Sequence, residues 1–495
     1  MIAKPITKFA HRVTNVEEIP RLVAYAFRAA HSGIKGPVLL DVPIDVLFTP
    51  PQQHRIAWGA LTVPPAYSPA PDPAAVEEVV KAWSAARRPV IITGTGVRGA
   101  GKVLTRLVAA THTPVFYSNK FSTPVAPDHE LRGGPAVALA MLEQKPDFVL
   151  LLAARTGFLL GGRSGAIVPD QGCTLAQVDV DGSEIGRSNA VHIGIVSDVS
   201  LFIDAFLAKT TAASASTSNG TTSDGTTASG ANFHRNDHWV QTCTSLRTNP
   251  SPFSNDPKIQ ADGHLHPYHA MSAIMRSLPP SSTIIIDGGE AGQWASMTAE
   301  LANPHLVIVS TGYLGFLGNG WGYSLGAVTA EPSRLVVNIH GDGSAGFHIQ
   351  ELDTYARFGL NIMTVVFNNN CWGMSVNGQD LLYQNITPHR PAVQLSKSCR
   401  YDIVAQGFGC EGAYVDKHEQ IAPKVEEFWK LSGPSLMNLI VSRTPTTPAT
   451  LSMVGATKDP DVIVVPYYDN VPRPYYKEAA GQRMEKGGDG EVDCV

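Results

Sequence analysis

Two short polar segments have the composition of the two ends of one site for a metal ion and a diphosphate. The first, 340–344, is His-Gly-Asp-Gly-Ser, and the second, 368–374, is Asn-Asn-Asn-Cys-Trp-Gly-Met. Asp342 supplies a hard carboxylate oxygen of the kind that Mg²⁺ prefers. The glycines beside it allow a close backbone turn whose amides can meet an anion. The first segment therefore predicts magnesium chemistry.

The elements around these segments must bring them together. The apolar, β-branched run 334–339 predicts a buried strand, 349–356 a helix and 361–367 a second buried strand. Neighbouring parallel strands end at the same edge of an open α/β sheet, which is where such sheets bind ligands. We therefore expect Asp342 and Asn369 to lie close to each other.

Two further glycine-rich segments belong to the same part of the chain. The block 311–322 is followed by an apolar stretch and predicts a loop that enters a tightly packed helix. The strand predicted over 283–287 runs into a Gly-Gly-Glu turn and a helix, whose N-terminus can hold an anion. Glu290 in this turn would be an awkward neighbour for a phosphate unless its side chain points away.

Gly-Asp-Gly followed by a strand that ends in Asn-Asn resembles the signature of the thiamine diphosphate-dependent enzymes, and the glycine-rich block strengthens this resemblance. The resemblance implies that Asp342, Asn369 and the backbone carbonyl of Cys371 hold Mg²⁺, which in turn holds the diphosphate. It also implies that the carbonyl of Gly315 meets the aminopyrimidine and that Leu317 supports the bent cofactor. The other cofactor contacts that it implies are Gly289, Ala291, Gly341, Gly343, Ser344, Gly373 and Met374.

The resemblance identifies a family more firmly than it identifies a substrate. The opening 5–13, the block 312–315 and the Leu-His-Pro-Tyr-His segment 265–269 are similar to benzaldehyde lyase, and acetolactate synthase and 2-hydroxyacyl-CoA lyase share the same chemistry. Where relatives have aromatic or imidazole groups near the substrate, this chain has Gly292 and Thr311. The implied activity is a carbon-carbon lyase or carboligase that acts on a 2-hydroxy ketone or a 2-keto acid, benzaldehyde lyase-like or acetolactate synthase-like.

The predicted fold class is α/β, with successive doubly wound parallel-sheet domains preceded by the end of a third domain. In the opening segment we expect a helix over 16–31 and a buried strand within 36–47, which resemble the end of a pyrimidine-binding domain. The predicted divisions are 1–50 for this remnant, 73–207 for a middle domain, 208–232 for a disordered Ser/Thr/Gly linker, 260–455 for the thiamine diphosphate-binding domain and 456–495 for a tail.

The family's activating glutamate belongs to the first domain, most of which is absent here, so no catalytic residue is assigned. In these dimers the cofactor lies between the last domain of one subunit and the first domain of its partner. Two interpretations stay open. In the first, the chain is an active lyase, which forms a homodimer or homotetramer if the chain is complete. In the second, it is a catalytically incomplete truncated homologue that binds cofactor weakly or pairs with a full-length subunit.

A Gly-x-Gly-x-x-Gly pattern at 94–99, after a predicted strand at 89–93, offers a different function, that of a nucleotide-binding oxidoreductase. The acidic residues Asp179 and Asp181 lie too far along the chain for a ribose ligand. FAD is therefore a disfavoured alternative cofactor. His266 and His269 could suggest a metal pair, but without other ligands nearby they favour the start of a helix.

Composition excludes several classes of protein. The 495 residues carry a net charge of −5 with 16% charged residues, so no nucleic-acid partner is expected. Six scattered cysteines without a Cys-x-x-Cys pair argue against zinc sites and disulfide scaffolds and favour a reducing compartment. We find no 18-residue apolar run and no signal peptide, so no membrane partner is expected. The expected location is the cytoplasm, with mitochondria and peroxisomes as alternatives.

Overall fold

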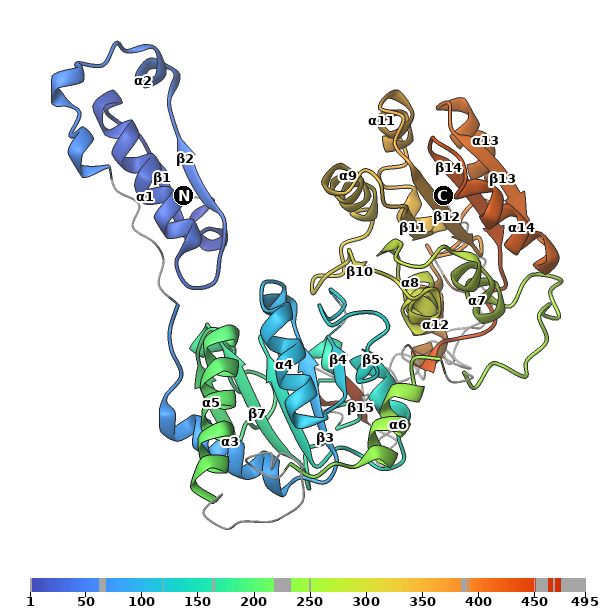
Figure 1. The fold of residues 1–495 in the computed structure, drawn as a ribbon. Coiled ribbons are helices and arrows are strands. Elements are labelled where there is room, and N and C mark those ends of the chain that lie inside the picture. Colours follow the sequence, from blue (N-terminus) through green and yellow to red (C-terminus); the bar gives the residue numbers. More distant parts are fainter. Residues whose placement is uncertain are drawn as a thin grey trace.

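The computed structural model describes residues 2–61, 68–118, 120–162, 165–217, 233–248, 251–383, 390, 392–448, 450, 462–465 and 468–472. An N-terminal unit stands apart from two larger α/β domains in Figure 1. Each of these domains contains a six-stranded sheet in which every paired strand is parallel, with helices on both faces. The predicted α/β class is therefore confirmed.

The N-terminal unit, residues 2–61, is a two-stranded parallel sheet with one long helix. Its elements are β1 (Phe9–Arg12), α1 (Ile19–His31), β2 (Val38–Asp41) and α2 (Ile44–Phe48), with 3₁₀ helices η1 (Lys4–Ile6), η2 (Val16–Glu18), η3 (Gln53–Arg55) and η4 (Trp58–Ala60). The prediction that the strand is buried was wrong: none of the β2 residues is buried, and Leu39 is 41% exposed. One helix covers only one face of a small sheet, so the other face stays open.

The middle domain has the strand order β5-β4-β3-β6-β7-β8. Its strands are β3 (Pro89–Thr93), β4 (Val115–Tyr117), β5 (Arg132–Pro135), β6 (Phe148–Leu152), β7 (Thr174–Asp179) and β8 (Ile193–Val196). One face packs against α3 (Pro73–Ala85), α4 (Gly101–Thr111) and α5 (Val199–Thr217), and the other against η6 (Ala136–Met141) and α6 (Asp237–Ser245). The central strands β3 and β6 are buried along their whole length because both faces of the sheet are covered.

Helix α5 continues to Thr217, so a helix occupies the first part of the segment predicted as a disordered linker, while 218–232 lie outside the described residues. At Gly94, a Cβ atom would lie 1.9 Å from the carbonyl oxygen of Ala153. Close packing between the turns after β3 and β6 therefore accounts for this glycine of the Gly-x-Gly-x-x-Gly pattern without a nucleotide.

The C-terminal domain has the strand order β10-β9-β11-β12-β14-β13. Its strands are β9 (Thr283–Ile286), β10 (Leu306–Val309), β11 (Val336–Gly341), β12 (Ile362–Asn368), β13 (Glu411–Val415) and β14 (Ser435–Ile440). Helices α7 (Pro267–Ser277), α8 (Glu290–Thr298) and α14 (His418–Phe428) cover one face, and α9 (Gly320–Ala330), α11 (Glu351–Arg357) and α13 (Tyr401–Gly407) cover the other. The short α10 (Asp342–Ala345), α12 (Gly373–Tyr383) and η9 (Ala299–Ala302) complete the domain.

His266 caps α7, because its side chain accepts a hydrogen bond from the backbone N–H of Tyr268, which confirms the predicted helix start. Within the predicted tail, β15 (Val462–Val465) and β16 (Tyr468–Pro472) form an antiparallel pair. Among the helices that the structure describes, none has the length and apolar character needed to cross a membrane.

Candidate functional site

The two predicted polar segments meet at the C-terminal edge of the central strands. β11 and β12 pair in parallel with Gly341 opposite Phe367, so Asp342 and Asn369 both follow directly from neighbouring strand ends. Both residues line one cavity of about 280 Å³. The predicted proximity of the two segments is therefore confirmed.

All twelve residues predicted to contact the cofactor or its metal line this same cavity. They are Gly289, Ala291, Gly315, Leu317, Gly341, Asp342, Gly343, Ser344, Asn369, Cys371, Gly373 and Met374. They come from four separate turns, which follow β9, β10, β11 and β12. The individual contacts remain predictions, but the fold brings every one of these positions to a single place.

Asp342 has the properties of an unsatisfied metal ligand. It is 4% exposed, and its Oδ1 accepts a hydrogen bond of 2.9 Å from the backbone N–H of Gly343. Its Oδ2 has no hydrogen-bond partner among the described residues. Burial raises the pKa of the carboxyl group to about 6, although backbone N–H groups of Gly343 and 369–371 act against this shift. A bound cation would satisfy the free oxygen and favour the ionised form.

The turn after β12 orients the amide of Asn369. Its Oδ1 accepts hydrogen bonds from the backbone N–H of Cys371 at 3.2 Å and from the Cys371 thiol at 3.4 Å. Asn370 between them has a φ of +60°, a left-handed conformation that asparagine tolerates. Burial raises the pKa of the Cys371 thiol to about 11. A neutral thiol is a poor metal ligand, so this residue is left with its backbone carbonyl for a hard cation.

The Glu290 carboxylate is held by hydrogen bonds from Thr447 and Thr450. Glu290 is the first residue of α8, 6% exposed, and its carboxylate accepts hydrogen bonds from the Thr447 backbone N–H at 2.8 Å and the Thr450 hydroxyl at 2.6 Å. Burial raises the pKa of Glu290, and these hydrogen bonds oppose the shift. The first-turn amides of α8 are thus left available for a negatively charged group.

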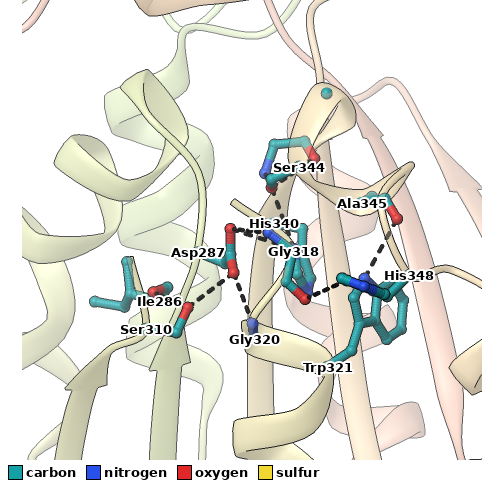
Figure 2. A network of polar contacts seen from close by, with 12 residues as sticks. Ile286, Asp287, Ser310, Gly318, Gly320, Trp321, His340, Ser344, Ala345 and His348 are labelled. Carbon is teal, nitrogen blue, oxygen red and sulfur yellow. Dashed lines mark hydrogen bonds and ion pairs between the residues drawn. The ribbon is translucent and has the colours of Figure 1, made fainter. Parts of the chain in front are cut away.

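Sequence reasoning missed the network that holds the glycine-rich turns in place. Asp287, fully buried at the end of β9, accepts hydrogen bonds from the Ser310 hydroxyl at 2.8 Å and from the backbone N–H groups of Gly320 at 2.6 Å and Gly318 at 3.1 Å. Figure 2 shows how this one carboxylate connects three segments. The available signal was an aspartate at the end of an apolar strand, directly before two glycines.

His340 extends this network to the Asp342 turn, as Figure 2 shows. Its Nδ1 lies 3.2 Å from the Ser344 hydroxyl and 3.9 Å from the Asp287 carboxylate, and its ring stacks on Trp321 with centroids 4.6 Å apart. Complete burial lowers the pKa of His340 to about 4, so the ring is neutral at physiological pH. The Ser344 hydroxyl also accepts a hydrogen bond of 3.0 Å from the Gly341 N–H and thereby fixes the turn.

Comparison with known proteins adds independent findings. Residues 287–439 match the model of the thiamine pyrophosphate enzyme C-terminal TPP-binding domain, and residues 76–206 match that of the thiamine pyrophosphate enzyme central domain. The first match contains the Asp342 and Asn369 turns, and the second contains the sheet of the middle domain.

Similar proteins cover most of this chain. The acetolactate synthase large subunit IlvG of Mycobacterium tuberculosis is 28% identical over 450 residues, which are 90% of this chain and 75% of that protein. The large subunit of acetolactate synthase isozyme 1 of Escherichia coli is 25% identical, with coverage of 92% and 77%. The crystal structure of benzoylformate decarboxylase from Polynucleobacter necessarius has a TM-score of 0.66 at 20% identity and covers 90% of this chain and 77% of that one. That last likeness is one of fold.

Proposed function

Since the chain belongs to the thiamine diphosphate-dependent enzyme family, we propose that it binds the cofactor through Mg²⁺ beside β11 and β12. There it makes or breaks a carbon-carbon bond next to the carbonyl group of a 2-keto acid or a 2-hydroxy ketone. The observation that carries the proposal is the buried Asp342 carboxylate, whose Oδ2 has no hydrogen-bond partner in the described part of the chain. A hard cation is the group that such an oxygen fits.

The residues that would hold the cofactor follow from their positions. The Asp342 carboxylate, the Asn369 amide oxygen and the Cys371 carbonyl would bind Mg²⁺. Gly289 and Ala291, at the N-terminus of α8, would present backbone amides to the diphosphate, because the helix dipole favours negative charge there. Leu317 would support the rings of the cofactor in the same cavity.

The bound cofactor supplies a place for the negative charge that develops on the carbonyl carbon. The protein's own residues orient and enclose the reacting groups. Small residues at Gly292 and Thr311 leave room for a substrate in the cavity wall. The proposal includes a homodimer or homotetramer, in keeping with the resemblance described above.

The proposal is tested by calorimetric titration with thiamine diphosphate in the presence and absence of Mg²⁺. The wild-type chain should show metal-dependent binding. Asp342→Ala should weaken it by about a hundredfold or more, since loss of groups that only support a metal ligand already costs roughly 10- to 100-fold. The control is Asp353→Ala, which removes a half-exposed carboxylate on α11 that pairs with Arg357 on the same helix.

Unchanged affinity in Asp342→Ala would contradict the assignment of the metal site. The same loaded samples are then assayed for pyruvate consumption and for acyloin cleavage. Turnover supports the lyase or carboligase, whereas binding without turnover supports the catalytically incomplete homologue.

A further inference from the structure

The middle domain contributes directly to the cofactor cavity of the C-terminal domain. Residues 120–122 pair in an antiparallel bridge with β10, the edge strand of the C-terminal sheet, with Phe121 opposite Ile308. The Val309 N–H donates to the Lys120 carbonyl at 2.9 Å, and the Ser122 N–H donates to the Val307 carbonyl at 2.9 Å. These hydrogen bonds fix the backbone of Lys120 against Val309, which lies two residues before the glycine-rich block 311–322.

The side chain of Lys120 lines the cavity together with Leu159, also from the middle domain. Lys120 is half-buried, and a Cβ atom placed on Gly312 would lie 3.7 Å from its Nζ. The aromatic rings of Phe121 and Tyr323 each lie 5.9 Å from Nζ, a long distance for a cation–π contact. Among the described residues, its ammonium group has no hydrogen bond or ion pair. The cavity wall thus holds a cation that has no anionic partner within the described part of the chain.

The other charged residues of the cavity are already placed. The Glu290 carboxylate is bound by the segment 447–450, and Asp342 is the proposed metal ligand. Arg443 is the second cation that lines the same cavity, and its charge acts on the Cys371 thiol. Lys120, by contrast, lies beside Gly312 in the glycine-rich block.

We propose that Lys120 is a specificity residue that binds the carboxylate of the substrate, so that the site selects an anionic carbonyl compound over a neutral one. The inference rests on the proposed function and narrows it from two substrate classes to the 2-keto acids. A half-buried ammonium group gains a charge-assisted hydrogen bond when it meets a carboxylate. Leu159, which lines the same cavity, provides an apolar contact for the rest of a small acid.

The test uses the full chain loaded with thiamine diphosphate and Mg²⁺, and two probes of similar size, one with a carboxylate and the other with a neutral carboxamide in its place. Oxamate has the carboxylate of a 2-keto acid with an amide in place of the reactive ketone, and oxamide is its neutral counterpart. Calorimetry should show that Lys120→Met weakens oxamate binding by about tenfold or more, as expected for loss of a hydrogen bond to a charged group. It should leave oxamide binding unchanged.

Two further variants separate a specific role from a structural one. Lys120→Arg keeps the charge and should retain most of the affinity for oxamate. Lys102→Met removes an exposed lysine of α4 in the same domain and should behave like the wild type. Equal oxamate affinity in Lys120→Met and wild type, or equal wild-type affinity for the two probes, would overturn the inference.

The titration with cofactor is run first on every variant. Lys120→Met should bind thiamine diphosphate as the wild type does. An equal loss of cofactor and oxamate affinity would overturn the inference, because it would assign Lys120 to the cofactor instead. Absence of metal-dependent cofactor binding in the wild type would be the failure of the proposed function itself.

Discussion

Two buried carboxyl groups in the proposed cofactor cavity have different tasks because their hydrogen bonds differ. Glu290 is satisfied by donors from the segment 447–450, so it connects α8 to the chain beyond β14. Asp342 lines the same cavity and keeps one oxygen without a hydrogen-bond partner in the described part of the chain. One residue therefore serves the structure, and the other is available to a ligand.

The Glu290 carboxyl should make stability depend on pH. Because burial raises its pKa, the folded protein binds a proton more tightly than the unfolded chain, and stability falls as pH rises through the folded pKa. Glu290→Gln removes this dependence. The stability of the variant minus that of the wild type should therefore be larger at neutral pH than near the ordinary pKa of a carboxyl group. Urea unfolding of both proteins at both pH values measures this difference.

The control for this experiment is Glu78→Gln, which changes an exposed carboxylate on α3 and should reproduce the wild-type pH dependence. The interpretation of Glu290 would fail if its variant and the wild type lost stability in parallel across the whole range.

At the scale of elements, the short helix α10, which directly follows β11, packs closely against Trp372, the residue before α12. A Cβ atom on Gly343 would lie 2.7 Å from the indole ring of Trp372, closer than real contacts allow. Gly343→Ala should therefore push the two turns apart and separate Asp342 from Asn369. We expect a loss of about 1–3 kcal/mol in unfolding free energy, together with weaker Mg²⁺-dependent cofactor binding by calorimetry.

Gly346→Ala is the matched control, because a Cβ atom there would lie at an ordinary 3.6 Å from the Gly343 carbonyl oxygen, in helical backbone. It should change neither stability nor cofactor binding appreciably. If both glycine variants behaved alike, packing against Trp372 would not be what requires Gly343.

The elements that sequence reasoning found, and those it missed, differ in how local their signals are. β9, β11 and β12 are β-branched, apolar and buried on both faces, so their composition alone predicts them. β5 has the sequence Arg-Gly-Gly-Pro, and β13 carries half-exposed residues, so neither has a strand pattern. Such strands form because the sheet beside them offers hydrogen bonds, which is tertiary information.

The same distinction applies to the site. Asp342 and Asn369 could be predicted because each lies in a short motif directly after a strong strand. The role of Asp287 depends on Ser310, Gly318 and Gly320, which approach it only after the chain has folded. Lys120 was not predicted either, since nothing in its local sequence indicates that it reaches a cavity of the next domain.

At the scale of the whole molecule, a buried charge cluster joins the two large domains. Glu300 of the C-terminal domain accepts hydrogen bonds from the Tyr117 hydroxyl at 3.0 Å and from the Arg132 guanidinium at 3.1 and 3.2 Å, both in the middle domain. Glu300 is 4% exposed and Arg132 fully buried. Burial raises the pKa of Tyr117 well above its usual value, so its hydroxyl remains a donor.

Removal of the Glu300 charge should uncouple the two domains. Glu300→Gln leaves Arg132 buried without a counter-charge, and loss of one partner of such a pair costs on the order of 3–5 kcal/mol. Differential scanning calorimetry should show a lower first transition and a wider separation between domain transitions. Glu331→Gln is the control, because its pair with Arg334 is exposed and should contribute less than about 1 kcal/mol.

A single unchanged transition in Glu300→Gln would show that the domains are held together by other contacts. The double variant Glu300→Gln with Arg132→Met also removes the Arg132 charge, although Arg247, whose Nε lies 3.6 Å from Glu300, keeps its own; it should recover part of the lost stability.

The bridge between residues 120–122 and β10 also bears on how the protein avoids association with other chains. An uncovered edge strand is a template for pairing with another polypeptide. Because an N-terminal domain generally folds first during synthesis, the segment that covers β10 is made before β10 leaves the ribosome. The order of the domains along the chain therefore protects this edge from the moment it exists.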